Sequence, residues 1–132
     1  MRWIGLDIHR TSVEAAELRD GETTVRRFRF RNTPEAWQRF AASLDRDAAV
    51  CLEATGNAFW IDDLLAGRAR EVVVAHPLKT RAIAEARIKT DKIDAEILAR
   101  LLKADFVARV WVPPKPVREL RSLLGHWCCL VK

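Results

Sequence analysis

The chain has 132 residues, of which 49% are hydrophobic and 31% charged, as expected of one globular domain that buries a core. No apolar run approaches the ~20 residues of a membrane span, and we find no signal-peptide cleavage site, so we expect a cytoplasmic protein without a membrane partner. Three cysteines without zinc-type spacing indicate neither a disulfide framework nor a zinc site. The net charge of +5 permits an anionic partner such as nucleic acid but does not identify one.

The first thirty residues predict a three-stranded antiparallel meander. In the first strand, Ile4 and Leu6 alternate with Gly5 and Asp7, which places the acid on the opposite face from the large apolar side chains. Asp20 and Gly21 form a hairpin turn signal between the second and third strands. The three predicted strands cover residues 3–9, 12–18 and 23–30.

The next part of the chain alternates helices with strands. Thr33 and Pro34 form a helix start, because threonine caps a helix and proline tolerates its first position. We expect Trp37 and Trp60 in the core. The predicted elements are helices over about 34–44, 57–65 and 78–87, with buried strands over 48–53 and 71–75. A meander followed by helix-linked strands predicts an α/β fold, with a mixed sheet and helices on its faces.

Residues 89–102 read as one amphipathic helix, in which Asp94 lies in line with Leu98 and the later leucines. Asp91 and Asp94 are three residues apart and therefore neighbours on the helix surface. Such a like-charged pair is costly unless a divalent metal ion or a basic side chain joins it. The simpler alternative is that Thr90 or Asp91 only caps the helix, and for this helix alone capping is the commoner explanation.

Four acids stand at the apolar ends of separate elements. Asp7 lies on the first strand and Glu53 ends the buried strand over 48–53, so a sheet that pairs these strands points both into one crevice. The helix that carries Asp91 and Asp94 is placed to cap that crevice. Each acid alone also fits an ordinary role as a cap or as a partner of arginine. Gathered carboxylates bind hard cations, which predicts Mg²⁺ (or Mn²⁺) rather than zinc.

Basic residues gather just before the acidic helix, and a second set alternates along the third strand. The first set comprises Lys79, Arg81, Arg87, Lys89 and Lys92. Beside a site for phosphodiester chemistry, we interpret this set as nucleic-acid-binding, although a solvated face is the alternative. The second set, Arg27, Arg29 and Arg31, is interpreted as a charged edge strand or as a phosphate contact.

Five short runs, in this order, resemble the DEDD-type transposases of bacterial insertion sequences, which are relatives of the Piv DNA invertases. The runs are Gly-Leu-Asp-Ile-His (5–9), Glu-Ala-Thr-Gly (53–56), Lys-Thr-Asp-Lys-Ile-Asp-Ala (89–95), Val-Pro-Pro (112–114) and Arg-Glu-Leu-Arg (118–121). The resemblance implies an RNase H-like domain of the kind seen in the RuvC junction resolvase. It also implies that Asp7, Glu53, Asp91 and Asp94 are the catalytic, metal-binding tetrad.

The last twenty residues predict a separate segment. A proline-rich break at 113–116 precedes a helix that begins at Val117 and reaches the chain end without a stop signal, as in a piece of a longer protein. We therefore expect an RNase H-like catalytic domain over 1–112 and, over 113–132, a linker that starts a coiled coil. A homo-oligomer through this helix is the expected assembly.

The resemblance also implies a function. Family members continue into a C-terminal domain with a nucleophilic serine, and some use a guide RNA. We thus expect the N-terminal domain of a DNA transposase or site-specific recombinase, which cleaves and transfers DNA strands together with that domain and is inactive alone. The alternatives are a stand-alone Holliday-junction resolvase or nuclease, and a non-enzymatic nucleic-acid-binding module. An actin-like ATPase is disfavoured, because no glycine-rich phosphate loop follows Asp7.

Overall fold

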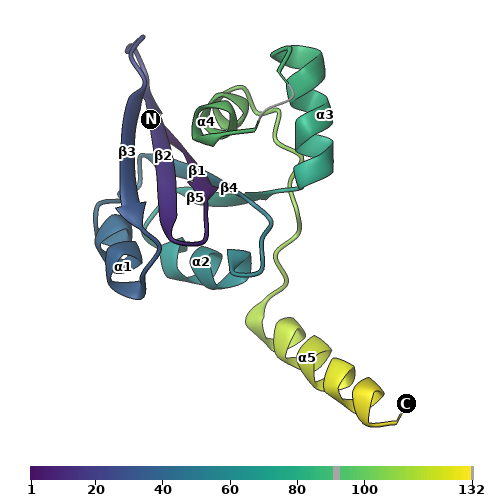
Figure 1. The fold of residues 1–132 in the computed structure, drawn as a ribbon. Helices are drawn as coiled ribbons and strands as arrows, with labels where there is room; N and C mark the ends of the chain where they lie inside the picture. The colour runs from purple at the N-terminus through teal and green to yellow at the C-terminus, as the bar shows by residue number, and fades with distance from the viewer. Residues whose placement is uncertain (91–92, 132) are drawn as a thin grey trace.

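A computed structural model describes residues 1–90 and 93–131, which form a five-stranded mixed sheet with helices on both faces (Figure 1). The strands are β1 (Arg2–Ile8), β2 (Ser12–Arg19), β3 (Arg26–Arg31), β4 (Ala48–Glu53) and β5 (Glu71–Ala75). The helices are α1 (Pro34–Ala42), α2 (Ala58–Leu65), α3 (Pro77–Arg87), α4 (Ala95–Lys103) and α5 (Lys115–Leu130). The strand order is β3-β2-β1-β4-β5, in which β1 is antiparallel to β2 and parallel to β4. The predicted α/β fold with its meander is confirmed.

The sheet separates two apolar layers. Ile4 and Leu6 of β1 face α1 and α2, where Trp37 and Leu65 are fully buried beside them. The opposite face is covered by α4 through a smaller cluster, whose buried members are Ala49, Cys51, Val73, Ala75, Leu98 and Leu102. Because alternate residues of a strand point to opposite faces, the residues in step with Cys51 belong to the α4 side.

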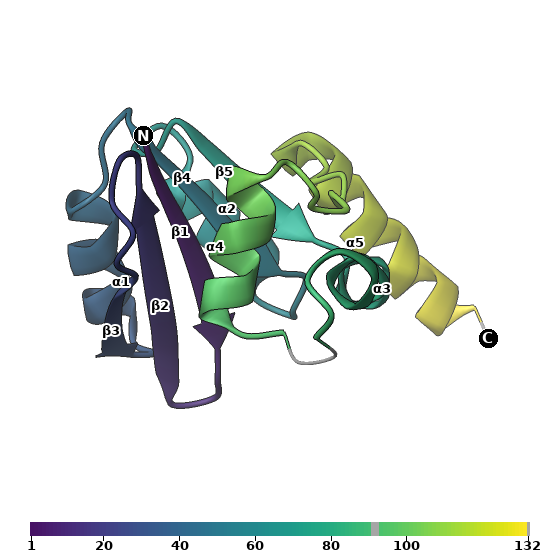
Figure 2. The ribbon, with the colours of Figure 1, turned by 90° about the horizontal axis from the view of Figure 1, so that it is seen from above.

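Helix α4 lies against β1 at unusually short range. A Cβ atom at Gly5 would stand 1.9 Å from the carbonyl oxygen of Ala95 and 2.6 Å from the backbone nitrogen of Ala99. At the other end of the helix, the Lys103 Nζ lies 5.1 Å from the centre of the Trp3 ring. The helix therefore runs opposite to β1, and its N-terminus points toward the carboxyl end of that strand (Figure 2).

The start of α4 differs from the predicted helix over 89–102. Lys89 has a φ of 60°, a left-handed conformation that a right-handed helix does not accommodate. The helix begins at Ala95, and Asp94 is its N-cap, with Oδ1 accepting a hydrogen bond of 2.9 Å from the Ile97 N–H. The prediction that Asp94 belongs to the helical apolar stripe is wrong, because its carboxylate satisfies a free N–H group at the helix end. Asp91 and Lys92 lie outside the described residues.

Two further expectations need correction. β3 begins at Arg26 rather than at residue 23. Trp37 is buried as predicted, with 1% of its surface exposed, but Trp60 is 47% exposed, because it packs edge-on against Trp37 at the rim of the core. After α4, the chain returns to the sheet through a bridge between Ala75 and Arg109.

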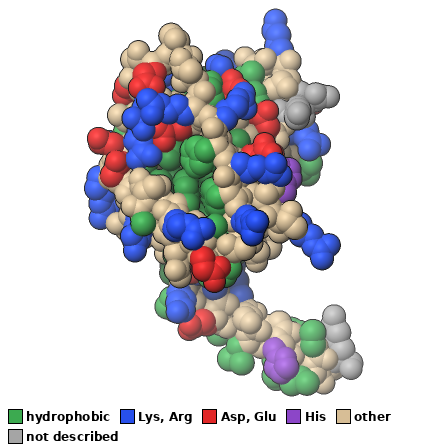
Figure 3. All heavy atoms as spheres, turned by 60° about the vertical axis from the view of Figure 1, so that its left-hand side comes forward, with side chains coloured by type: hydrophobic (Ala, Val, Ile, Leu, Met, Phe, Trp, Pro, Cys, Tyr) green, Lys and Arg blue, Asp and Glu red, His purple; other side chains and the backbone are tan. Residues whose placement is uncertain are grey.

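Helix α5 projects away from the sheet and has no buried residue (Figures 1 and 3). Its first turns are held to α2, where both terminal nitrogens of Arg118 donate to the Asp63 carboxylate at 2.8 and 3.0 Å. Beyond that anchor, large apolar side chains such as Leu123 and Trp127 are exposed. The coiled coil expected for this helix stays a prediction.

Replacing Gly5 by alanine tests the packing of α4 on β1. The three atoms that the new methyl group would meet all belong to the helix backbone, so the helix must shift, and we expect a loss of about 1–3 kcal/mol in the free energy of unfolding. Urea denaturation measures this loss. Gly56→Ala is the matched control, because a Cβ at Gly56 meets nothing within 4 Å. Equal stabilities for the two variants would contradict the close contact.

Candidate functional site

Asp7 and Glu53 lie side by side at the carboxyl ends of the inner strands β1 and β4, and we name this end of the sheet the acidic edge. Leu6 of β1 is in register with Leu52 of the parallel strand β4, and the next residue on each strand is the acid. Glu53 follows Cys51 by two residues and therefore faces the α4 side of the sheet. Asp7 follows Gly5 by two residues and shares that face. The sequence prediction that both acids point to one side of the strand ends agrees with this geometry.

The two carboxylates differ in their surroundings. The side chain of Asp7 is 29% exposed, and the His9 Nε2 lies 3.0 Å from its Oδ2. Glu53 is partly buried, and burial raises its pKa above the ordinary value, with the charge of Asp7 raising it further. Arg81 opposes both effects and lowers the pKa of Glu53. The two acids therefore repel each other, and among the described residues no lysine or arginine forms an ion pair with either carboxylate.

Asp94 stands at the end of α4 that points to these acids. It precedes Ala95, whose carbonyl packs over Gly5, two residues before Asp7 on the same strand face. One of its oxygens is engaged as the helix cap. The predicted fourth acid, Asp91, lies outside the described residues, so three of the four predicted acids are placed by the structure on the α4 side of the sheet.

The donor set decides whether a metal ion fits this edge. Carboxylate oxygens are the ligands that Mg²⁺ and Mn²⁺ prefer, and a cation would relieve the repulsion between Asp7 and Glu53. Within residues 1–90 and 93–131, however, no group of three His, Cys, Asp or Glu side chains is arranged to hold a metal ion. The two strand-end carboxylates have the chemistry that such a cation prefers. A third ligand is not in place among the described residues.

The Cys51 thiol is unsuited to nucleophilic chemistry at this face. Cys51 lies two residues before Glu53, but it is fully buried, and burial raises the pKa of its thiol to about 12. A buried thiol that holds its proton this firmly is not a nucleophile near neutral pH.

The predicted basic set is found on α3 and just after it. Lys79, Arg81 and Arg87 are exposed on the helix, and Lys89 follows it. Arg81 is near enough to Glu53 to influence its charge, whereas the Arg87 guanidinium lies 5.0 Å from the centre of the Phe106 ring. The fifth member, Lys92, lies outside the described residues. Among the described members of the set, Arg81 is the one whose charge lowers the pKa of Glu53.

A family model of IS110-type DEDD transposases matches residues 4–132. The chain belongs to this transposase family. The mixed five-stranded sheet with flanking helices agrees with the RNase H-like domain expected of a DEDD transposase. No curated protein matches the chain.

One solved structure similar to this transposase-family chain is an inorganic polyphosphate/ATP-glucomannokinase from Arthrobacter sp. strain KM. The two chains share 21% identity with a TM-score of 0.45, and the match covers 69% of this chain and 50% of the kinase chain. This chain therefore spans about half the length of that kinase. No helix in the described part of the chain is both long and apolar enough to cross a membrane.

Sequence reasoning overlooked Gly5. The signal was present, since an isolated glycine inside a strand pattern indicates close approach of another backbone. What approaches it is α4, which lies ninety residues further along the chain, and no local pattern identifies that partner.

The raised pKa of Glu53 predicts a pH-dependent stability. The folded protein binds this proton more tightly than the unfolded chain, so the contribution is present below the ordinary glutamate pKa and is lost as pH rises through the raised value. With EDTA at pH 7, Glu53→Gln should melt roughly 2–5 °C above the wild type, and this difference should shrink toward pH 4. Thermal melts across this range measure it.

Glu35→Gln is the control, because Glu35 is exposed on α1, on the opposite face of the sheet. It should show no pH-dependent gain. A Glu53→Gln variant that is destabilised equally at every pH contradicts the electrostatic explanation.

Proposed function

We propose that this chain is the N-terminal domain of a DNA transposase whose metal-binding catalytic residues are Asp7, Glu53, Asp91 and Asp94. The observation that carries the proposal is the side-by-side placement of Asp7 and Glu53 at the carboxyl ends of two parallel strands, in a chain of the transposase family. Ligand sites of open α/β sheets lie at this position. In this proposal residues 1–112 form the catalytic domain, and 113–132 form a linker and the start of a helical segment.

The proposed cofactor is Mg²⁺ or Mn²⁺, held by the carboxylates. Such an ion, when bound, polarises a phosphodiester and favours the ionised form of an attacking hydroxyl or water. Asp7 and Glu53 provide the paired negative charge that selects a cation. The N-terminus of α4 presents the positive end of its helix dipole to the same edge, which favours a bound phosphate. His9 holds one side of Asp7 and so orients that carboxylate.

The proposed substrate is DNA, bound in part by the basic set predicted from the sequence over 79–92. These side chains neutralise phosphates without reading bases, and Arg81 joins them to the acidic edge. The residues proposed for this contact are Lys79, Arg81, Arg87, Lys89 and Lys92. Strand transfer is proposed to need a serine-bearing domain in addition to this chain, and a guide RNA is a further proposed partner.

A metal titration tests the acidic site. Injecting Mn²⁺ into the wild type should release or absorb heat, and the Asp7→Asn/Glu53→Gln variant should give only the heat of dilution, because both proposed ligands then lack charge. Isothermal titration calorimetry measures these heats. Glu35→Gln, which removes one negative charge on the other face of the sheet, is the control. Equal heats from all three proteins would remove the metal site from the proposal.

Helix α5 supports a further part of the proposal, which is assembly through this helix with a second copy. The exposed Leu120, Leu124 and Trp127 recur at spacings of four and three residues, and Val117 and Val131 extend this seam at both ends. This is the seam of a coiled coil. A partner helix would remove these side chains from water.

Charge placed in that seam should separate the copies. We expect a dimer or larger oligomer for the wild type and a monomer for Leu124→Glu/Trp127→Glu, measured by sedimentation equilibrium. Ser122→Glu adds charge on the other side of the same helix and should leave the mass unchanged. Unaltered circular dichroism would show that the sheet domain stays folded. A monomeric wild type contradicts this part of the proposal.

A further inference from the structure

A row of partly exposed side chains runs from the carboxyl end of β1 across β2 to β3. The N-terminus of α4 reaches β1 at Gly5, and the row of residues beyond that point runs across three strands. In this row Asp7 of β1 is paired with Glu14 of β2, which is paired with Arg29 of β3. Glu14 and Arg29 are more than half exposed. Since neighbouring strands are about 4.8 Å apart, Arg29 begins about 10 Å from the strand that carries Asp7.

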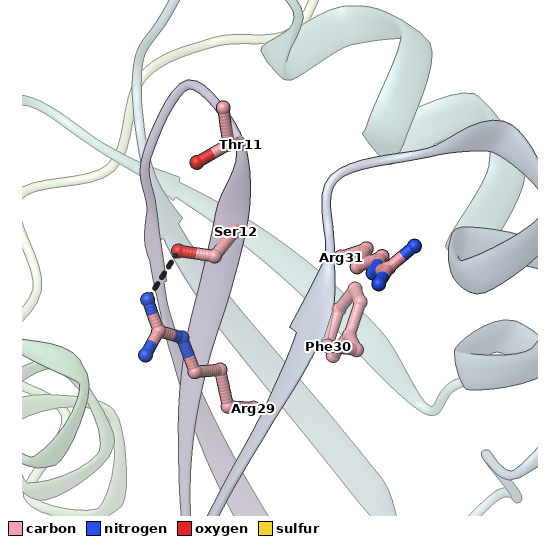
Figure 4. Close-up of a pocket in the computed structure, with 5 residues that line it drawn as sticks. All are labelled: Thr11, Ser12, Arg29, Phe30 and Arg31. Carbon is pink, nitrogen blue, oxygen red and sulfur yellow. Dashed lines mark hydrogen bonds between the residues drawn. The ribbon is translucent and has the colours of Figure 1, made fainter.

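An open pocket of about 530 Å³ lies at the β3 end of this row, and we name it the β3-edge pocket. It is lined by Thr11, Ser12, Arg29, Phe30 and Arg31 (Figure 4). The Arg29 guanidinium donates a hydrogen bond of 3.2 Å to the Ser12 Oγ, whereas Arg31 points away from Ser12 (Figure 4). The two guanidinium groups therefore stand on different sides of the pocket.

Hydrogen bonds of the turn between β1 and β2 hold the pocket in shape. The Asn32 side-chain amide donates to the carbonyl of His9 at 2.9 Å, which ties the turn between β1 and β2 to the end of β3. The His9 N–H donates to the Ser12 carbonyl at 2.8 Å and closes that turn. These bonds hold the Ser12 hydroxyl next to Arg29 and keep Thr11 in the pocket lining.

The charges of the pocket favour an anion. The side chain of Arg31 has no hydrogen-bond or ion-pair partner within residues 1–90 and 93–131. Arg29 is 68% exposed, and the nearest Glu14 oxygen is 3.8 Å from its Nε, at the limit of an ion pair. Arg27 differs, because it is bound to Glu96 of α4 and therefore has a structural role. Exposed guanidinium groups beside hydroxyl donors are a typical phosphate-binding set.

We propose that the β3-edge pocket binds the phosphodiester backbone of a nucleic acid strand, with Arg29 and Arg31 contacting separate phosphates. The strand then crosses the carboxyl end of β1 toward Asp7, about 10 Å from the strand that carries Arg29. This proposal rests on the proposed function, because that function supplies the reason for a strand to reach Asp7. Glu14 lies beside the path and weakens the contact through its charge.

Fluorescence anisotropy of labelled single-stranded DNA, in EDTA and at several salt concentrations, tests the pocket. Arg29→Glu/Arg31→Glu should weaken binding about tenfold or more and should lower the salt dependence by about 1.4, the value for two phosphate contacts on a single strand. Arg46→Glu/Arg68→Glu is the matched control, because it makes the same charge change at the opposite end of β4 and β5. Equal losses for both variants would reduce the effect to net charge and overturn the proposal.

Two milder variants distinguish a loss of binding from a loss of folding. Arg31→Gln changes a side chain without a described partner and should weaken binding about threefold. Glu14→Gln removes the competing carboxylate and should tighten binding about twofold to fivefold, a gain that no unfolded protein produces. Unchanged affinity in both variants, or a wild type that binds no nucleic acid, would overturn the proposal. RNA of the same sequence, measured in parallel, shows which nucleic acid supplies the phosphates.

The EDTA condition separates this proposal from the proposed catalytic site. The Asp7→Asn/Glu53→Gln variant should bind the strand at least as well as the wild type, since it loses negative charge near the path. If the pocket variants lose affinity while the metal titration shows no site, the pocket stands and the metal-dependent function fails.

Discussion

The contact between Gly5 and the backbone of α4 is the constraint on which the acidic edge depends. Only a residue without a side chain lets the Ala95 carbonyl approach β1 this closely. This contact brings the N-terminus of α4 over the strand just before Asp7. The cap residue Asp94 and the positive end of the helix dipole arrive at the sheet edge as a consequence. A bulkier residue at position 5 would move the helix and, with it, the third acid.

Glu17 and Glu53 lie toward opposite ends of the sheet, and their pKa values are shifted in opposite directions. Glu17 is almost fully buried, which acts to raise its pKa, but hydrogen bonds from Arg2 and Arg19 lower it below the ordinary value. Glu53 receives no such bond from residues 1–90 or 93–131, and both burial and the charge of Asp7 raise its pKa. The first arrangement is a neutralised structural ion pair. The second leaves a repulsion unresolved by the described side chains, as is typical of functional sites.

Positive charge is placed on both flanks of the acidic edge. On one flank α3 carries Lys79, Arg81 and Arg87 near β5, with Arg81 close enough to influence Glu53. On the other flank the β3-edge pocket carries Arg29 and Arg31 at the outer strand. Asp7 and Glu53 lie on β1 and β4, two of the three strands between β3 and β5. The proposed phosphate contacts therefore lie on both sides of the two acids.

The sequence by itself determined the order and type of the elements, and the family. The apolar runs over 48–53 and 71–75 became β4 and β5 with unchanged bounds, because strands buried on both faces carry a continuous local signal. The alternation around Asp7 correctly assigned its face, and the motif order predicted the transposase family that the family match confirms.

Only the tertiary structure decided how these parts meet. The pairing of β1 with β4 brings Asp7 beside Glu53, which is forty-six positions away, and no local pattern encodes such a pairing. The start of α4 was decided by the left-handed Lys89 and by Asp94 as a cap, where periodicity alone predicted a longer helix. Trp60 was left exposed because Trp37 already fills the core beside it. Burial and charge coupling depend on neighbours in space, and the fold alone supplies those neighbours.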